Sequence, residues 1–256
     1  VPPMGKKAVV IDAGGTNFRV ALVSFSDSGP VIEHEERDSM PGASEPAAWQ
    51  DFIDFCADKL LPYLPQAEAI GFCFSYRTEI TPHRDGRVIA LSKAVQLSGC
   101  EGRYICADLR EALRKRGAPE RPAVVLNDTA AVLMSGSPLL DGGNYDSLIG
   151  LVCGTGENTC CTMDTGRIGR LSLPPGSQML VDLESCCFDG WPQGDYDREL
   201  DAASTAPGDH LLEKKTSGVY LGELSRLTLR GAARDGLFTP QGAAAVESLE
   251  TFSAAE

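Results

Sequence analysis

The order of apolar and polar positions predicts short strands alternating with helices. Apolar runs of strand length that end in polar residues or glycine lie at 8–12, 18–25, 69–75, 88–91, 124–126, 147–153 and 159–163. Apolar residues near helical spacing predict helices over 47–64, 109–116, 130–134 and 210–229, the last interrupted at Ser217-Gly218. This alternation is typical of an α/β fold.

One junction between a strand and a helix carries candidate chemistry. The apolar residues 124–126 run into Asn127-Asp128-Thr129 and then into the predicted helix. Open α/β sheets bind ligands at the carboxyl ends of their strands, so Asp128 is a candidate general base facing a cleft. The alternative is that Asp128 or Thr129 only caps the helix, because both residue types are favoured there.

Two segments share the order strand, glycine turn, strand. The first turn is Ala13-Gly14-Gly15-Thr16-Asn17 and the second is Gly154-Thr155-Gly156-Glu157-Asn158. Glycine serves where the backbone takes a positive φ or approaches a ligand closely, and such turns aim N–H groups at anions. Asp12, just before the first turn, could hold a water bound to Mg²⁺. Each turn taken alone also fits an ordinary hairpin with a solvated polar residue.

Charge and cysteine content narrow the function classes. A net charge of −13 over 256 residues argues against binding to nucleic acids or anionic membranes. The N-terminus lacks the apolar core of a signal peptide, and no apolar run approaches the ~18 residues of a membrane span. Nine cysteines without a C-x-x-C pair lack the zinc signatures and predict reduced, buried thiols in a cytoplasmic protein. The acidic run 195–201 is expected to be a solvated surface.

Five motifs occur in the order found in eukaryotic-type hexokinases and glucokinase. In one-letter code they are DAGGTNFR at 12–19, FCFS at 72–75, LNDT at 126–129, GTGEN at 154–158 and EKKTSGVYLGE at 213–223. The sequence therefore resembles the hexokinase family from about Ala8 to Phe238. The resemblance implies an α/β, actin-like ATPase (ribonuclease H-like) fold of two lobes, with mixed sheets flanked by helices and the second lobe incomplete. Residues 1–122 would form the small lobe with the first phosphate hairpin, and residues 123–256 the beginning of the large lobe, which carries the base.

The resemblance also implies an activity, the phosphorylation of a hexose by ATP at the 6-hydroxyl, as in the first step of glycolysis. Glucose is the expected substrate, Asp128 the base, and Lys93 the cation between the sugar and the phosphate. The other expected sugar ligands are Ser75, Ser92, Asn127, Asn158, Glu184 and Glu213. The expected ligands of ATP and Mg²⁺ are Asp12, Gly14, Gly15, Thr16, Asn17, Gly154, Thr155 and Gly156, with Asp12 reaching the metal through a water.

Several positions depart from the family pattern. Ser92 replaces a threonine, Arg77 stands where the family has a proline, and Glu184-Ser185-Cys186-Cys187-Phe188-Asp189 replaces Glu-Trp-Gly-Ala-Phe-Gly. The family's second glycine-rich phosphate segment and its adenosine segment are not recognisable. The alternative function is a non-catalytic sugar-binding module or regulator of the same fold, whereas an actin-like structural protein fits the sugar motifs poorly. Neither the oligomeric state nor the preferred hexose follows from the sequence.

Overall fold

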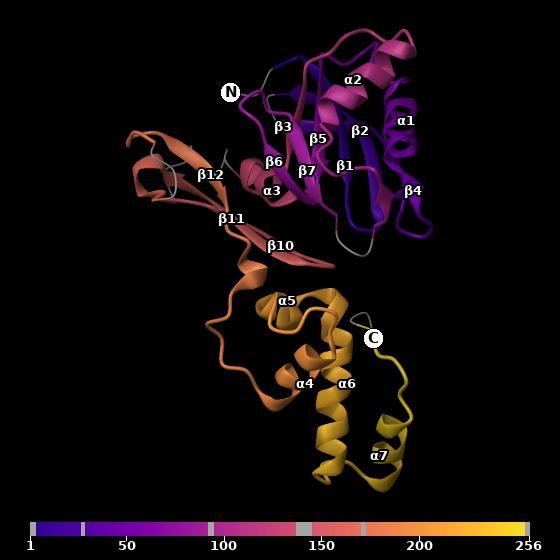
Figure 1. Cartoon of the computed structure of the whole chain (residues 1–256), viewed down its shortest axis with the longest axis vertical. Helices are drawn as coiled ribbons and strands as arrows, with labels where there is room; N and C mark the ends of the chain where they lie inside the picture. The colour runs from indigo at the N-terminus through magenta and orange to yellow at the C-terminus, as the bar shows by residue number, and fades with distance from the viewer. Residues whose placement is uncertain (1–3, 27–28, 92–94, 137–144, 170–172, 254–256) are drawn as a thin grey trace. The chain divides into compact units, whose positions relative to one another are not determined.

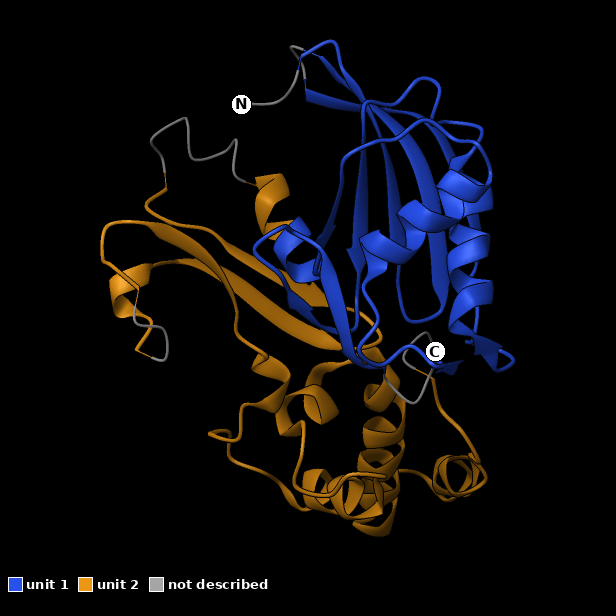
Figure 2. Cartoon of the chain, turned by 45° about the horizontal axis from the view of Figure 1, so that its top comes forward, with its two compact units in different colours: residues 1–131 blue, residues 132–256 orange. Residues whose placement is uncertain are grey.

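The computed structural model describes residues 4–26, 29–91, 95–136, 145–169 and 173–253 (Figure 1). The chain forms two compact units, residues 1–131 and residues 132–256 (Figure 2). Helix α3 (Asp128–Gly136) crosses the boundary between them. The assignment of a small and a large lobe on either side of residue 122 stays a prediction.

A five-stranded mixed sheet forms the centre of the first unit. Its order is β3 (Gly29–Ser39), β2 (Asn17–Ser26), β1 (Lys7–Ala13), β5 (Ala69–Phe74) and β9 (Ala123–Leu126). β1, β2 and β3 pair antiparallel, whereas β1, β5 and β9 run parallel. The predicted hairpin around the first glycine turn is confirmed, with Asp12 opposite Arg19 across it.

Two helices lie side by side on one face of this sheet, α1 (Trp49–Leu60) and α2 (Ile105–Lys115) (Figure 1). Their apolar stripes meet the sheet in the main core, which is built around the rings of Phe52, Phe72 and Phe74. α1 begins two residues later than predicted, because residues 47–48 form the short strand β4 and pair with β8 (Leu97–Ser98).

Besides the short strands β4 and β8, the apolar pattern did not reveal two longer strands of the first unit. The segment 77–87, expected as a polar turn, contains β6 (Arg77–Ile80) and the start of β7 (Gly86–Ala90), which pair antiparallel. β3 is a polar, exposed edge strand that pairs only with β2. Backbone pairing forms these strands, and their exposed side chains have no apolar alternation to indicate it.

The second unit contains a three-stranded antiparallel sheet in the order β10 (Ile149–Cys153), β11 (Glu157–Asp164) and β12 (Gln178–Asp182). Two short 3₁₀ helices follow β11 and β12, η2 (Thr165–Arg167) and η3 (Ser185–Cys187). The remaining helices are α4 (Asp195–Ala203), α5 (Leu211–Thr216), α6 (Gly218–Arg234) and α7 (Pro240–Glu247). α6 contacts α4, α5 and α7 (Figure 1). The predicted break at Ser217-Gly218 is confirmed, since α5 ends and α6 begins there.

The acidic run 195–201 was expected to be a solvated surface, which holds for Asp195 and Glu199 but not for Asp197 and Asp201. The run forms most of α4, and Asp197 and Asp201 pair with lysines of α5. Lys214 is 4% exposed and donates to Asp201 Oδ1 at 2.5 Å and to the carbonyl of Ala206 at 2.6 Å. Lys215 pairs with Asp197 at 3.0 Å. A buried ammonium group needs such partners, and only the folded chain brings them together.

Among the described residues, no helix has both the length and the apolar character needed to cross a membrane.

Candidate functional site

The carboxyl ends of three neighbouring parallel strands bring predicted site residues together in the first unit. Asp12 is the second-to-last residue of β1, Ser75 follows β5, and Asn127 and Asp128 follow β9. Asp12 lies opposite Cys73 across β1 and β5, and Cys73 lies opposite Leu126 across β5 and β9. Parallel strands end at the same edge of a sheet, so these polar residues share that edge.

Asp128 takes part in capping, which is one of the two roles that the sequence left open. Asn127 precedes α3, and its side-chain Oδ1 accepts from the Thr129 N–H at 2.8 Å. Asp128 Oδ1 accepts from the same N–H at 2.8 Å and from the Thr129 hydroxyl at 3.2 Å. Among the described residues, Asp128 Oδ2 has no hydrogen-bond partner. Asn127 therefore caps the helix together with one Asp128 oxygen, and the other oxygen is available to a substrate.

The negative charges of two carboxylates at this edge help to raise the pKa of one thiol, that of Cys73. Burial, and then the negative charges of Asp12 and Asp128, raise the pKa of the Cys73 thiol. Asp12 also pairs with Arg19, with Nη1 and Oδ2 3.0 Å apart in a partly exposed contact. Asp12 and Asp128 are therefore both near Cys73 on β5.

The first glycine turn is fixed by hydrogen bonds on both sides. The Gly14 N–H donates to the Asn17 carbonyl at 3.0 Å, and the Tyr76 hydroxyl donates to the Gly14 carbonyl at 2.8 Å. Gly15 has no positive φ, and a side chain built there would meet open space. Neither backbone conformation nor packing therefore requires glycine at position 15.

A second group of predicted site residues lies in the second unit, around the turn between β10 and β11. The Glu157 N–H donates to Glu213 Oε1 at 3.2 Å. The Gly218 N–H donates to the Gly154 carbonyl at 2.7 Å, which joins the turn to the start of α6. A Cβ added at Gly156 would lie 2.7 Å from Glu213 Oε1. The glycine at 156 therefore makes room for the carboxylate of Glu213.

Asn158 links this turn to the segment that contains Glu184. Asn158 Oδ1 accepts from the Ser185 N–H at 3.1 Å, and its Nδ2 donates to Asp182 Oδ1 at 2.8 Å. Glu184 is exposed and has a left-handed backbone, with φ 48°. Burial, followed by Cys187 and then by the charges of Glu184 and Glu213, raises the pKa of the Cys186 thiol. Asn158, Glu184 and Glu213 thus belong to one neighbourhood. The predicted residues Ser92 and Lys93 lie outside the described part of the chain.

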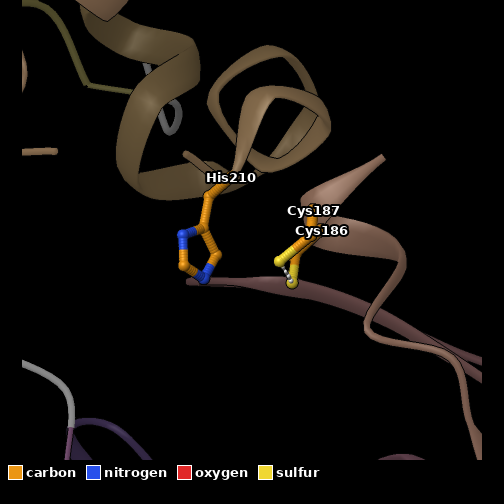
Figure 3. A group of neighbouring side chains, drawn as sticks. All are labelled: Cys186, Cys187 and His210. Carbon is orange, nitrogen blue, oxygen red and sulfur yellow. Dashed lines mark hydrogen bonds between the residues drawn. The ribbon is translucent and has the colours of Figure 1, made fainter. Parts of the chain in front are cut away.

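The second unit also holds a group of side chains that the sequence did not reveal, namely Cys186, Cys187 and His210 (Figure 3). The two cysteines are adjacent and so lack the C-x-x-C spacing that is typical of zinc sites. The sequence signal that could have pointed to this group is that both cysteines lie in the segment 184–189, which departs from the family pattern.

Comparison with known proteins identifies the family. Two family models, both described as hexokinase, match residues 4–137 and 148–255. The chain belongs to the hexokinase family. This hexokinase-family chain is 32% identical over 235 residues to Hexokinase-4, chloroplastic, of Oryza sativa subsp. japonica, covering 86% of this chain and 45% of that protein. It is 31% identical over 243 residues to Hexokinase-2 of Homo sapiens, covering 90% of this chain and 26% of that protein. The chain therefore spans about half the length, or less, of the curated relatives it matches.

Solved structures confirm the predicted hexokinase fold of the actin-like ATPase class. The hexokinase from Schistosoma mansoni complexed with glucose matches with a TM-score of 0.72 at 25% identity, covering 93% of this chain and 55% of that one. A ROK hexokinase from Thermus thermophilus matches with a TM-score of 0.52 at 16% identity, covering 92% of this chain and 71% of that one, and shows the fold alone.

Proposed function

We propose that the protein to which this chain belongs transfers a phosphoryl group from ATP to the 6-hydroxyl of a hexose, with glucose as the expected substrate. The observation that carries the proposal is the placement of Asp128 at the carboxyl end of β9. One of its oxygens is used in capping, and the other has no partner in the described structure. Membership of the hexokinase family supports the same reaction.

In this proposal Asp128 takes the proton from the sugar 6-hydroxyl as that oxygen attacks phosphorus. A positioned base of this kind contributes roughly 10²–10⁴ in rate. The other sugar hydroxyls would bind Ser75, Asn127, Asn158, Glu184 and Glu213, and also Ser92 and Lys93. Amides and carboxylates suit a ring of hydroxyls, because a site built to pair a hydroxyl can reject an analogue that lacks it by about 10⁴–10⁵.

ATP and Mg²⁺ would be held by the two glycine turns. Gly14, Gly15, Thr16 and Asn17 in the first turn, and Gly154, Thr155 and Gly156 in the second, would present backbone N–H groups and hydroxyls to the phosphates. The open space beside Gly15 and Gly154 supports this assignment. Asp12 would hold Mg²⁺ through a water, and the metal would neutralise charge on the phosphates. With a net charge of −13, the chain has few other means of binding them.

Asp128→Ala tests the role of the base. We expect turnover to fall by about 10²–10⁴ in the full-length protein, while hexose affinity, measured by equilibrium binding, changes far less. Ser135→Ala, at an exposed position later on the same helix, is the matched control. Near-normal turnover in Asp128→Ala would contradict the assignment.

Hexose-dependent release of ADP by this chain separates the kinase from the non-catalytic alternative. The chain would be assayed with Mg²⁺ and ATP over glucose, mannose, fructose and N-acetylglucosamine. Release with a hexose would support the kinase and rank its substrates. Stabilisation on heating by glucose without ADP release would favour a sugar-binding module for this chain. A role in glycolysis and a cytoplasmic location stay predictions, and one similar rice protein is named as chloroplastic.

A further inference from the structure

Two thiols and one imidazole meet where η3 and the start of α5 lie against each other. Cys186 and Cys187 belong to η3, and His210 directly precedes α5. One ligand atom of each residue lies within 4.8 Å of the other two. Cys186 is buried, His210 is half-buried, and Cys187 is exposed, so the group lies at the surface with one open side. In Figure 3 the sulfurs of Cys186 and Cys187 both point toward the imidazole ring of His210.

The separation of the sulfurs fits a tetrahedral metal ion. The two Sγ atoms are 3.6 Å apart. Two thiolates at the Zn–S distance of about 2.3 Å and a tetrahedral angle would be separated by about 3.8 Å. The imidazole nitrogen would have to move slightly toward the two sulfurs to become the third ligand of the ion. The ligand atoms of the three residues already lie within 4.8 Å of one another.

A carboxylate orients the imidazole for this role. His210 Nδ1 lies 3.2 Å from Asp209 Oδ2. A carboxylate beside Nδ1 favours the tautomer with its proton there, which leaves the lone pair of Nε2 for a metal. Figure 3 shows the ring nitrogen farther from the backbone on the side of the sulfurs. Ligating histidines commonly have such an outer partner.

We propose that Cys186, Cys187 and His210 bind one divalent cation of the zinc class. Two sulfurs and one imidazole nitrogen form a soft donor set that suits Zn²⁺ and disfavours Mg²⁺ and Ca²⁺, which prefer oxygen. Binding converts both thiols to thiolates and releases their protons. Glu184 is a further oxygen donor beside the group, since its Oε2 lies 3.6 Å from the Cys186 sulfur.

The cation would join the segment that carries Glu184 to the segment that carries Glu213, and both carboxylates are expected sugar ligands. Glu184 precedes the cysteines by two residues, and Glu213 follows His210 by three. A shared metal would hold η3 against α5 and stabilise the fold of this unit, since a ligand that binds only the folded state raises its stability. The inference is independent of the proposed kinase activity, because its readout is the metal itself.

The test is a metal titration of the whole chain, stripped with a chelator and kept reduced by a non-chelating phosphine. Zn²⁺ would be titrated in competition with a chromophoric chelator, and Co²⁺ would serve as an absorbing probe of thiolate ligands. We expect one ion per chain, a thiolate-to-Co²⁺ absorption band that Zn²⁺ removes, and a higher melting temperature with Zn²⁺.

Two variants and two matched controls assign the ligands. Cys187→Ser and His210→Ala change an exposed and a half-buried side chain, so they avoid disturbing the buried Cys186. Each should weaken Zn²⁺ binding at least tenfold. Cys153→Ser and His83→Ala change an exposed cysteine and an exposed histidine elsewhere and should leave the affinity unchanged. Absence of a thiolate band, or equal affinity in Cys187→Ser and the unchanged chain, would overturn the proposal.

Discussion

At the scale of single residues, the polar pair Asn127-Asp128 caps α3 with one side-chain oxygen of each residue. A polar pair after a strand and before a helix can cap the helix or face a ligand, and the sequence cannot separate these roles. In the structure, Asn127 Oδ1 and Asp128 Oδ1 both accept from the Thr129 N–H. Capping therefore uses one oxygen of Asp128 and does not exclude a role for the other in catalysis.

Gly156→Ala should displace Glu213 and lower the affinity for hexose. The added Cβ would lie 2.7 Å from Glu213 Oε1, which is the end of a flexible side chain and can move without unfolding the turn. We expect at least a tenfold loss of hexose affinity in equilibrium binding, with little change in melting temperature.

Gly154→Ala, in the same turn, is the matched control for hexose binding. A Cβ at Gly154 would meet nothing within 4 Å, and Gly154 has no positive φ. Hexose affinity should stay normal in this variant. Equal hexose affinities in both variants would remove Glu213 from the list of sugar ligands.

At the scale of elements, a single carboxylate joins α1 to α2. The indole N–H of Trp49, which is 3% exposed, donates to Asp108 Oδ2 at 2.7 Å. Arg103 donates to both oxygens of Asp108 at 2.8 Å. The apolar periodicity correctly predicted Trp49 as a core residue. The polar partner of its N–H comes from 59 residues further along the chain.

Asp108→Ala should destabilise the first unit by about 1–3 kcal/mol, because it leaves the buried N–H of Trp49 without an acceptor. Urea denaturation followed by tryptophan fluorescence would measure the change. Glu111→Ala is a control on the same helix. Glu111 pairs with Arg114 at side-chain exposures of 46% and 72%, and an exposed pair of this kind contributes at most about 1 kcal/mol. A change in Asp108→Ala no larger than in the control would contradict this role.

At the scale of the whole molecule, apolar burial is unequal between the two units. The main core, with the rings of α1 and β5, belongs to residues 1–131. It also buries thiols, and burial, followed by the charge of Asp85, raises the pKa of Cys106 from 9.0 to about 12. The folded protein therefore holds this thiol protonated at pH values where the unfolded chain ionises it.

This difference predicts a loss of stability in alkali. A group whose pKa is higher in the folded state contributes stability that is complete below the unfolded pKa, near 9, and is lost as the pH rises toward 12. Cys106→Ala should flatten the decline of the urea midpoint above pH 9, even though it lowers stability at pH 7. Cys153→Ala, at an exposed thiol, should keep the original slope. Parallel slopes for Cys106→Ala and the unchanged chain would refute the prediction.

The sequence by itself determined the local elements and the polar residues at their ends. The two glycine hairpins, the strand before Asp128 and the break at Ser217 were predicted correctly, because apolar period and turn chemistry act over a few neighbouring residues. The family motifs also predicted the fold class correctly. The roles of the individual site residues stay predictions.

Only the tertiary structure decided which distant residues meet. It placed β1, β5 and β9 in parallel, which gathers Asp12, Ser75 and Asp128 at one edge. It also paired the acidic run with the buried Lys214 and brought His210 to two cysteines more than 20 residues earlier. Such contacts follow from strand pairing and from the needs of buried charges. Neither leaves a periodic trace in the sequence, because the partners are far apart along the chain.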